Sequence, residues 1–230
     1  MTRSAEWWYR APQAHNASAA CVSPPPLYAG AVDASERQLE EILTRAQAEG
    51  ALGSRPIPEV IAHARGFVAA LPATTSRVVD VGTGAGVPGL IIALDCPFLQ
   101  VTLVDRRDKR IDALQRAVRA LGWESRVQTI ATTAEELCVH PEHRGTYDAV
   151  VARGFGSPVV LLPLAVQLVC AGGVVIVSEP PEALGSRWDL DWVRSLGCQA
   201  PERIGSVVRF HVEHTGGAAS TSQDAHPSAS

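Results

Sequence analysis

Short apolar runs separated by amphipathic stretches dominate the chain from residue 77 onward. The runs have the length and β-branched content of buried strands. The intervening stretches carry apolar residues at the three- and four-residue spacing of one helix face. Strands that alternate with helices predict a parallel sheet covered by helices on both faces, a doubly wound α/β fold. The expected strands are 78–81, 101–104, 127–130, 147–152 and 174–177, with helices at 108–121, 157–169 and 183–196 and a final antiparallel strand at 207–212.

Two further helices are predicted ahead of this sheet. One begins at the N-cap Ser35 and ends at Gly50, and the other spans 58–71. The expected architecture is a Rossmann-like domain with an N-terminal helical extension. Stretches rich in Ala, Ser and Pro at one end of the chain, and in Gly, Ala and Ser at the other, predict disorder. The expected boundaries are a leader at 1–33, the helical extension at 34–73, the domain at 74–213 and a tail at 214–230.

The composition fits a reducing intracellular environment. Five widely spaced cysteines, none in a C-x-x-C pair, predict buried free thiols rather than a zinc site or a disulfide framework. The histidines lack metal-ligand spacing, so we expect no metal. No apolar run approaches the ~18–20 residues that cross a bilayer. The net charge of −4 argues against a protein coated in positive charge, although a local basic patch stays possible. We expect a cytoplasmic monomer that does not bind membranes.

A glycine-rich turn between the first strand and the next helix is the strongest functional signal. Gly82, Gly84 and Gly86 let a ligand approach the backbone, where amide groups and the helix dipole face it. Such a turn suits either the pyrophosphate of a dinucleotide or the methionine end of S-adenosylmethionine. The string from Gly84 to Gly89 satisfies G-x-G-x-x-G literally. Counted from Gly82, however, the spacing is G-x-G-x-G, and Val87 occupies the third-glycine position of a dinucleotide site.

Acidic residues at the strand ends favour the methyl donor. Asp80 lies in the strand just before the turn, where a carboxylate repels pyrophosphate but helps to place a ligand with sulfonium and ammonium groups. Asp105 ends the second strand, where it can accept hydrogen bonds from both ribose hydroxyls. Ala134 and Glu135 follow the third strand and are placed to line an adenine pocket. The alternatives are that Asp105 caps the next helix and that Glu135 is a solvated acid in a first helical turn.

Four segments of the domain resemble the RsmG/GidB family. They are 79–89, 101–110, 133–137 and 147–153. That family comprises class I methyltransferases that act on guanine N7 of 16S ribosomal RNA. The resemblance implies S-adenosylmethionine as cofactor, and ribosomal RNA or the small ribosomal subunit as partner. It also implies that the cofactor contacts Gly82, Val87, Ala134, Glu135 and Arg153.

Other segments depart from the family pattern. Ser178-Glu179-Pro180-Pro181 stands where family members carry Lys-Gly, which reverses a charge where the RNA would lie. The Asn-Leu-Thr and His-Asp-Ser features of the N-terminal helices are missing, with His63 as a remnant. These departures leave open a diverged methyltransferase with a small-molecule or protein acceptor. An NAD(P)-binding oxidoreductase, which rests on the literal glycine pattern, and a non-catalytic partner-binding module are further alternatives.

The chemistry expected at the site is mainly alignment of two reactants. Guanine N7 carries an unprotonated lone pair, so methyl transfer to it needs no strong general base. The fourth strand ends in Arg153-Gly154-Phe155-Gly156 rather than in the (Asp/Asn/Ser)-Pro-Pro-(Tyr/Phe) motif of amino-directed enzymes. Arg153 is the candidate catalytic residue, since it can pair with a carboxylate of the site or touch RNA. Phe155 could stack on a base or pack in the core.

A basic cluster opens the helix after the second strand. It consists of Arg106, Arg107, Lys109 and Arg110. The cluster could bind phosphate, with a solvated helix start as the equal alternative. Cations at a helix N-terminus are locally unfavourable.

Overall fold

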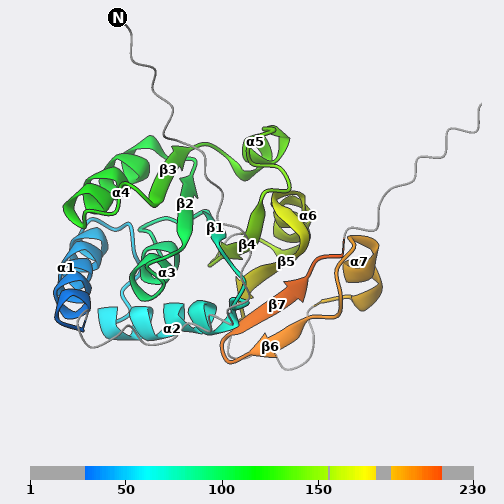
Figure 1. Cartoon of the computed structure of the whole chain (residues 1–230), viewed down its shortest axis with the longest axis horizontal. Coiled ribbons are helices and arrows are strands. Elements are labelled where there is room, and N and C mark those ends of the chain that lie inside the picture. Colours follow the sequence, from blue (N-terminus) through cyan, green and yellow to red (C-terminus); the bar gives the residue numbers. More distant parts are fainter. Residues whose placement is uncertain (1–28, 155, 180–187, 214–230) are drawn as a thin grey trace, which may run out of the picture.

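The computed structural model describes residues 29–154, 156–179 and 188–213, which fold around one mixed sheet (Figure 1). The strands are β1 (Arg77–Val81), β2 (Gln100–Asp105), β3 (Val127–Ala131), β4 (Tyr147–Ala152), β5 (Val169–Ser178), β6 (Glu202–Ile204) and β7 (Val207–His211). In the described residues they form a seven-stranded sheet of order β3-β2-β1-β4-β5-β7-β6. β1 to β5 are parallel, and β7 runs antiparallel between β5 and β6. This is the fold of class I methyltransferases, as predicted.

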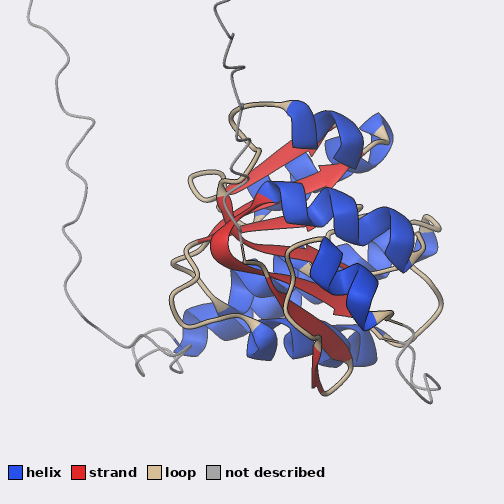
Figure 2. Cartoon of the chain, turned by 90° about the vertical axis from the view of Figure 1, so that its right-hand side faces the viewer, coloured by secondary structure: helices blue, strands red, loops and turns tan. Residues whose placement is uncertain are grey.

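Helices cover both faces of the sheet (Figure 2). They are α1 (Ala29–Ala48), α2 (Ile57–Ala70), α3 (Gly89–Asp95), α4 (Asp108–Ala120), α5 (Ala134–Val139), α6 (Pro158–Leu168) and α7 (Leu190–Ser195). Neighbouring strand residues point to opposite faces, so Val78 packs with α1 to α4 and Val79 packs with α5 to α7. The two resulting apolar clusters enclose the sheet and hold the ends of β1, β2 and β4 in place.

The N-terminal helices belong to the same core as the sheet. Leu39 and Leu43 of α1 and Phe67 of α2 are fully buried in the cluster that also contains Val78. The Arg65 guanidinium of α2 donates to Glu36 of α1 at 2.8 Å and to Asp95 of α3 at 3.0 Å. The helical extension is therefore packed directly against the domain. No helix in the described part of the chain combines the length and the apolar character needed to cross a membrane.

The predicted strands and the antiparallel last strand are confirmed, with differences at the element ends. α1 begins at Ala29, ahead of the predicted N-cap Ser35, because the intervening alanines are strong helix formers. Residues 29–33 thus belong to a helix and not to the predicted leader. β5 begins at Val169 rather than at 174, since a register shift opposite Tyr147 lets it pair with β4 earlier. The three-residue β6 was not predicted, because so short a segment has no periodic signal.

Some predictions fall outside the described residues. These are the segments 1–28 and 214–230, Phe155, and the first part of the helix expected at 183–196. The described part of that helix contains α7.

Candidate active site

The glycine turn after β1 is a compact loop. Thr83 N–H donates to a backbone carbonyl at the end of β2 at 2.9 Å, and Gly86 N–H donates to the Thr83 carbonyl at 2.9 Å. Gly82, Gly84 and Gly86 have φ angles of 69°, 60° and 89°, a backbone region that residues other than glycine rarely adopt. A Cβ added at Gly84 would meet no atom closer than Arg110 Nη1, at 3.7 Å. Gly84 therefore borders open space, as a ligand-binding loop requires.

Asp105 at the end of β2 is joined directly to this loop. Its Oδ2 accepts hydrogen bonds from Gly84 N–H at 3.0 Å and from Arg110 Nη1 at 3.2 Å. Its Oδ1 accepts from Arg107 N–H at 3.0 Å. A carboxylate offers about four acceptor positions, so one stays available for a ribose hydroxyl. A second hydroxyl would replace the part-exposed Arg110, whose side chain is 27% exposed.

Asp80 lies fully buried behind the loop. Its Oδ2 accepts hydrogen bonds from Thr83 Oγ1 at 2.7 Å and from Gly89 N–H at 2.8 Å. Its Oδ1 is buried and has no hydrogen-bond partner among the described residues. Burial raises the pKa of Asp80 to about 6, against the opposing effect of the Thr83 and Gly89 hydrogen bonds. A Cβ at Gly89 would clash with the Leu103 side chain and come within 2.9 Å of Asp80 Oδ2, so the packing here requires a glycine.

Arg153 after β4 lies close enough to Asp80 for the two charges to interact. Burial lowers the pKa of Arg153, and the Asp80 carboxylate opposes that shift. His63 of α2 belongs to the same group, because burial and then the positive charges of Arg153 and Arg55 lower its pKa. The His63 Nδ1 atom is buried and lacks a hydrogen-bond partner within the described ranges. Asp80, Arg153 and His63 therefore form a polar group beside the glycine turn.

Of the remaining predicted site residues, Gly86 has a packing role, and Val87, Ala134 and Glu135 differ in burial. A Cβ at Gly86 would come within 2.7 Å of Leu90 side-chain atoms, so packing against α3 already requires a glycine there. Val87 and Ala134 are buried, and Glu135 is exposed in the first turn of α5. None of these positions by itself identifies a ligand.

Glu179 has a different environment from the one predicted. Its side chain is only 6% exposed, and its Oε1 accepts a hydrogen bond from Trp188 Nε1 at 2.8 Å. Trp188 in turn packs edge-on against Phe210 of β7, with ring centroids 4.6 Å apart. The expectation that Glu179 presents a reversed charge to RNA is wrong, because a buried and hydrogen-bonded carboxylate does not face a substrate surface. No local sequence pattern pointed to Trp188 as its partner.

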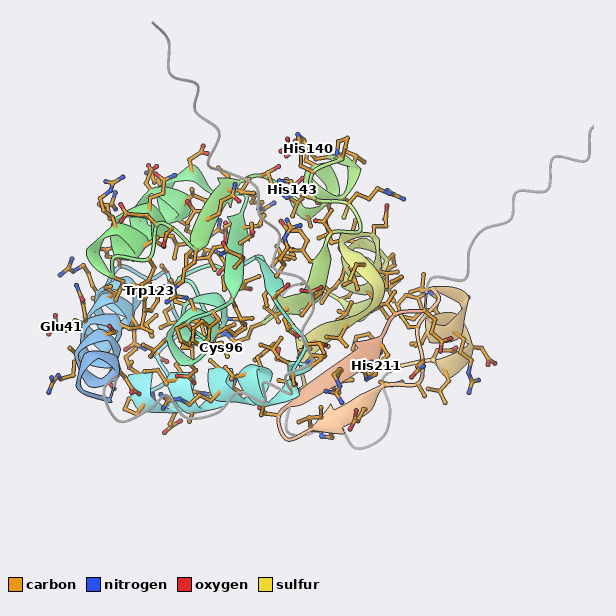
Figure 3. All side chains as sticks on the ribbon, in the orientation of Figure 1. Glu41, Cys96, Trp123, His140, His143 and His211 are labelled. Carbon is orange, nitrogen blue, oxygen red and sulfur yellow. The ribbon has the colours of Figure 1, made fainter. Side chains whose placement is uncertain are left out.

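Three possible metal ligands meet on the turn after α5. Atoms of His140, Glu142 and His143 lie within 4.8 Å of one another, and His143 Nδ1 lies 2.7 Å from the Tyr147 hydroxyl. Figure 3 shows both histidines at the α5 end of the molecule. Their clustering was not expected from the spacing. The absence of a bound metal stays a prediction.

Solved structures share the fold. An S-adenosylmethionine-dependent methyltransferase, SibL in its apo form, is 23% identical with a TM-score of 0.51, covering 61% of this chain and 51% of that chain. An O-methyltransferase family protein from Burkholderia thailandensis is 16% identical with a TM-score of 0.50, covering 80% of this chain and 60% of that chain. At these identities the likeness concerns the fold alone.

Curated relatives are similar in sequence to part of this chain. The ribosomal RNA small subunit methyltransferase G of Deinococcus deserti is 39% identical over 105 residues, 46% of this chain and 43% of the relative. The protein of the same description from Deinococcus radiodurans is 37% identical over 142 residues, 62% of this chain and 54% of the relative. The chain thus spans about half the length of the curated relatives that it matches.

A family model covers the segment from α1 to the end of β5. The GidB model, described as rRNA small subunit methyltransferase G, matches residues 38–179, more than half of the chain. The match includes the glycine turn, Asp80, Asp105 and Arg153. The resemblance noted from the sequence is therefore confirmed, and the chain belongs to the GidB family of rRNA small subunit methyltransferases G.

Proposed function

We propose that the protein transfers a methyl group from S-adenosylmethionine to guanine N7 of 16S ribosomal RNA. The observation that carries the proposal is the hydrogen bond between Gly84 N–H and Asp105, which joins an open glycine turn to a carboxylate on the next strand. A glycine turn next to a carboxylate suits a ligand that carries a ribose next to a charged amino-acid portion. Family membership supports the RNA acceptor.

The residues present fit this cofactor. Asp105 would accept the ribose hydroxyls, and the open face of Gly84 would let the ligand approach the backbone. The buried Asp80 carboxylate would favour the ammonium group through its negative charge, while Arg153 would pair with the carboxylate of the methionine portion. Val87, Ala134 and Glu135 would line the adenine side. Gly82 would contact the ligand, as the family resemblance implies, and Gly86 would shape the turn against α3.

These residues would act by alignment. Bound S-adenosylmethionine supplies an electrophilic methyl group on a sulfonium. Guanine N7 presents a lone pair without a proton, so the chain needs to hold donor and acceptor in line and to exclude water. Arg153, which is part-buried beside Asp80, would hold one end of the methyl donor. Its positive charge would not repel guanine, because the base is neutral. The negative charge of Asp80 behind the turn would repel a pyrophosphate, which disfavours a dinucleotide cofactor.

The test is methyl transfer to 16S RNA that lacks N7 methylation, either as small subunits or as free RNA. Tritiated S-adenosylmethionine should label the RNA, and strand scission at N7-methylguanine should map the label to one position. Label in protein or in a small molecule, but not in RNA, would overturn the acceptor. Calorimetry should show binding of S-adenosylmethionine and none of NADH. Light scattering and cell fractionation would check the expected cytoplasmic monomer.

A further inference from the structure

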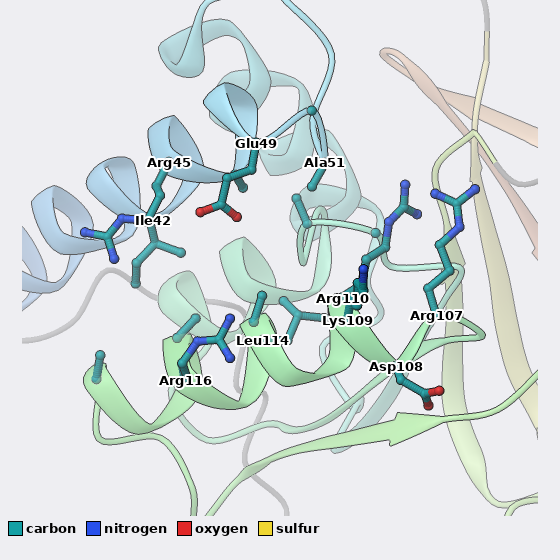
Figure 4. Close-up of a pocket in the computed structure, with 17 residues that line it drawn as sticks. Ile42, Arg45, Glu49, Ala51, Arg107, Asp108, Lys109, Arg110, Leu114 and Arg116 are labelled. Carbon is teal, nitrogen blue, oxygen red and sulfur yellow. The ribbon is translucent and has the colours of Figure 1, made fainter.

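A groove runs between the end of α1 and the whole length of α4. It has a volume of about 750 Å³ and reaches the glycine turn at Gly84 and Ala85 (Figure 4). Arg45 and Glu49 line it from the α1 side, and Arg107 and Arg116 line it from the α4 side. The groove therefore begins at the glycine turn of the proposed cofactor site and extends away from it along α4.

The groove combines an apolar floor with a basic rim. Ile42 and Ala46 of α1 face Ala113, Leu114 and Ala117 of α4 along the floor. Five cationic side chains and two carboxylates line the groove, in a chain whose net charge is −4. The cationic residues are Arg45, Arg107, Lys109, Arg110 and Arg116, and the carboxylates are Glu49 and Asp108.

Most of this positive charge is not neutralised by the protein. Arg45, Arg107, Lys109 and Arg116 are exposed, and none forms an ion pair within the described residues. Arg110 pairs with Asp105 of the proposed ribose site at 3.2 Å. Cations around the first turn of a helix oppose its dipole, so their placement on α4 does not serve helix stability.

We propose that the groove binds the phosphodiester backbone of the RNA substrate beside the cofactor site, a proposal that rests on the proposed function. Residues 107 to 116 extend over roughly 14 Å of helix, long enough for more than one phosphate. Exposed arginines and lysines bind phosphates through charge-assisted hydrogen bonds and counterion release. The apolar floor offers a surface for sugar and base, as in sites for single-stranded nucleic acid.

Two exposed arginines outside the groove, one on α4 and one on α7, supply a control. Arg119 of α4 is 70% exposed, lies outside the groove and faces Glu124 at 3.6 Å. Arg194 of α7 is also exposed and pairs with Asp191 at 3.2 Å. The double variant Arg119→Glu/Arg194→Glu therefore makes the same total charge change as Arg45→Glu/Arg116→Glu, but away from the groove.

The experiment measures binding of unmethylated 16S RNA to the full chain over a range of salt concentrations. The groove variant should bind at least about tenfold more weakly than the wild type, with the slope of log K against log salt reduced by about 2. The control variant should stay within about twofold to threefold of the wild type. Affinity for S-adenosylmethionine and the circular dichroism spectrum should be unchanged in both, which separates lost RNA contacts from misfolding.

Two outcomes would overturn the groove proposal. The first leaves the proposed function standing, and the second is the failure of that function. If the wild type methylates RNA and the groove variant binds RNA as the wild type does, or no more weakly than the control variant does, the groove assignment is wrong and the activity stands. If the wild type places no label in RNA, the proposed function fails and the groove assignment fails with it.

Discussion

The backbone amide of Gly84 donates a hydrogen bond to Asp105 Oδ2 at 3.0 Å. This bond links two segments that are separated by 21 positions in the chain and lie at the ends of adjacent parallel strands. It places the open side of the glycine turn beside the Asp105 carboxylate, which can accept one more hydrogen bond.

Gly84→Val should reduce the affinity for S-adenosylmethionine at least about tenfold, because its branched side chain would fill the space above the turn. The positive φ of 60° adds a conformational cost of about 1–2 kcal/mol. Gly122→Val is the matched control, since Gly122 has φ 68° and no atom within 4 Å of an added Cβ. Both variants should lose similar stability in thermal unfolding, and only Gly84→Val should lose binding in calorimetry. Equal affinities in the two variants would refute the ligand position.

Asp105→Ala should lower the same affinity by roughly tenfold or more, because it removes the ribose acceptor and releases the Gly84 amide. Arg110→Ala removes only the ion pair to Asp105 and keeps the hydrogen bond to the turn. Its affinity should stay within a few-fold of the wild type. Calorimetry on both variants checks this difference. A larger loss in Arg110→Ala would mean that Arg110 itself holds the ligand.

Asp80 should give the unliganded protein a characteristic pH dependence. Its pKa of about 6 in the fold lies above the ordinary value of 3.8, so the ionised carboxylate destabilises the folded state. That loss grows as the pH rises from about 4 to 6 and reaches roughly 3 kcal/mol as an upper estimate. Asp80→Asn should therefore be more stable than the wild type at pH 7.5 and lose this advantage near pH 4. Chemical denaturation across this range measures the difference, and a constant difference would contradict the assignment.

The affinity for the cofactor should also depend on the protonation of Asp80. Folding favours the protonated carboxyl, whereas cofactor binding should favour the ionised carboxylate. An ammonium-bearing ligand favours ionised Asp80, so affinity should fall about tenfold per pH unit below pH 6. The Asp80→Asn variant should bind the cofactor more weakly than the wild type at pH 7.5. Its affinity should lack the pH dependence that Asp80 causes between pH 5 and 7.5. Titrations in buffers of different ionisation enthalpy would detect the proton released on binding. Parallel pH profiles in the two proteins would exclude Asp80 as the ammonium partner.

Glu179→Lys, which restores the residue typical of the family, should destabilise the fold by about 3 kcal/mol or more, because an ammonium would be buried beside the Trp188 N–H donor. Glu179→Gln keeps an acceptor oxygen and should cost about 1 kcal/mol. Thermal unfolding compares the two. A stable Glu179→Lys protein with tighter RNA binding would return this side chain to the substrate surface.

Periodicity was sufficient to predict the fold class and the adjacency of the glycine turn and Asp105. Both follow from local patterns, since consecutive parallel strands bring their carboxyl ends to one edge of the sheet. The effect of the Arg153 charge on His63 could not be predicted, because it depends on where α2 lies against the sheet. The burial of Glu179 likewise depends on Trp188, nine positions further along the chain. Charged residues look alike in sequence whether they are solvated or enclosed.

The bridge that Arg65 makes between Glu36 and Asp95 gives the RNA groove a dependence on a distant residue. α1 supplies one wall of the groove, and a single guanidinium fastens that helix to two others. The width of the groove therefore depends partly on the Arg65 ion pairs, which lie outside the groove and away from any bound phosphate. A change at Arg65 would leave every groove contact chemically intact and would act only through the position of α1, which Leu39 and Leu43 also hold in the core.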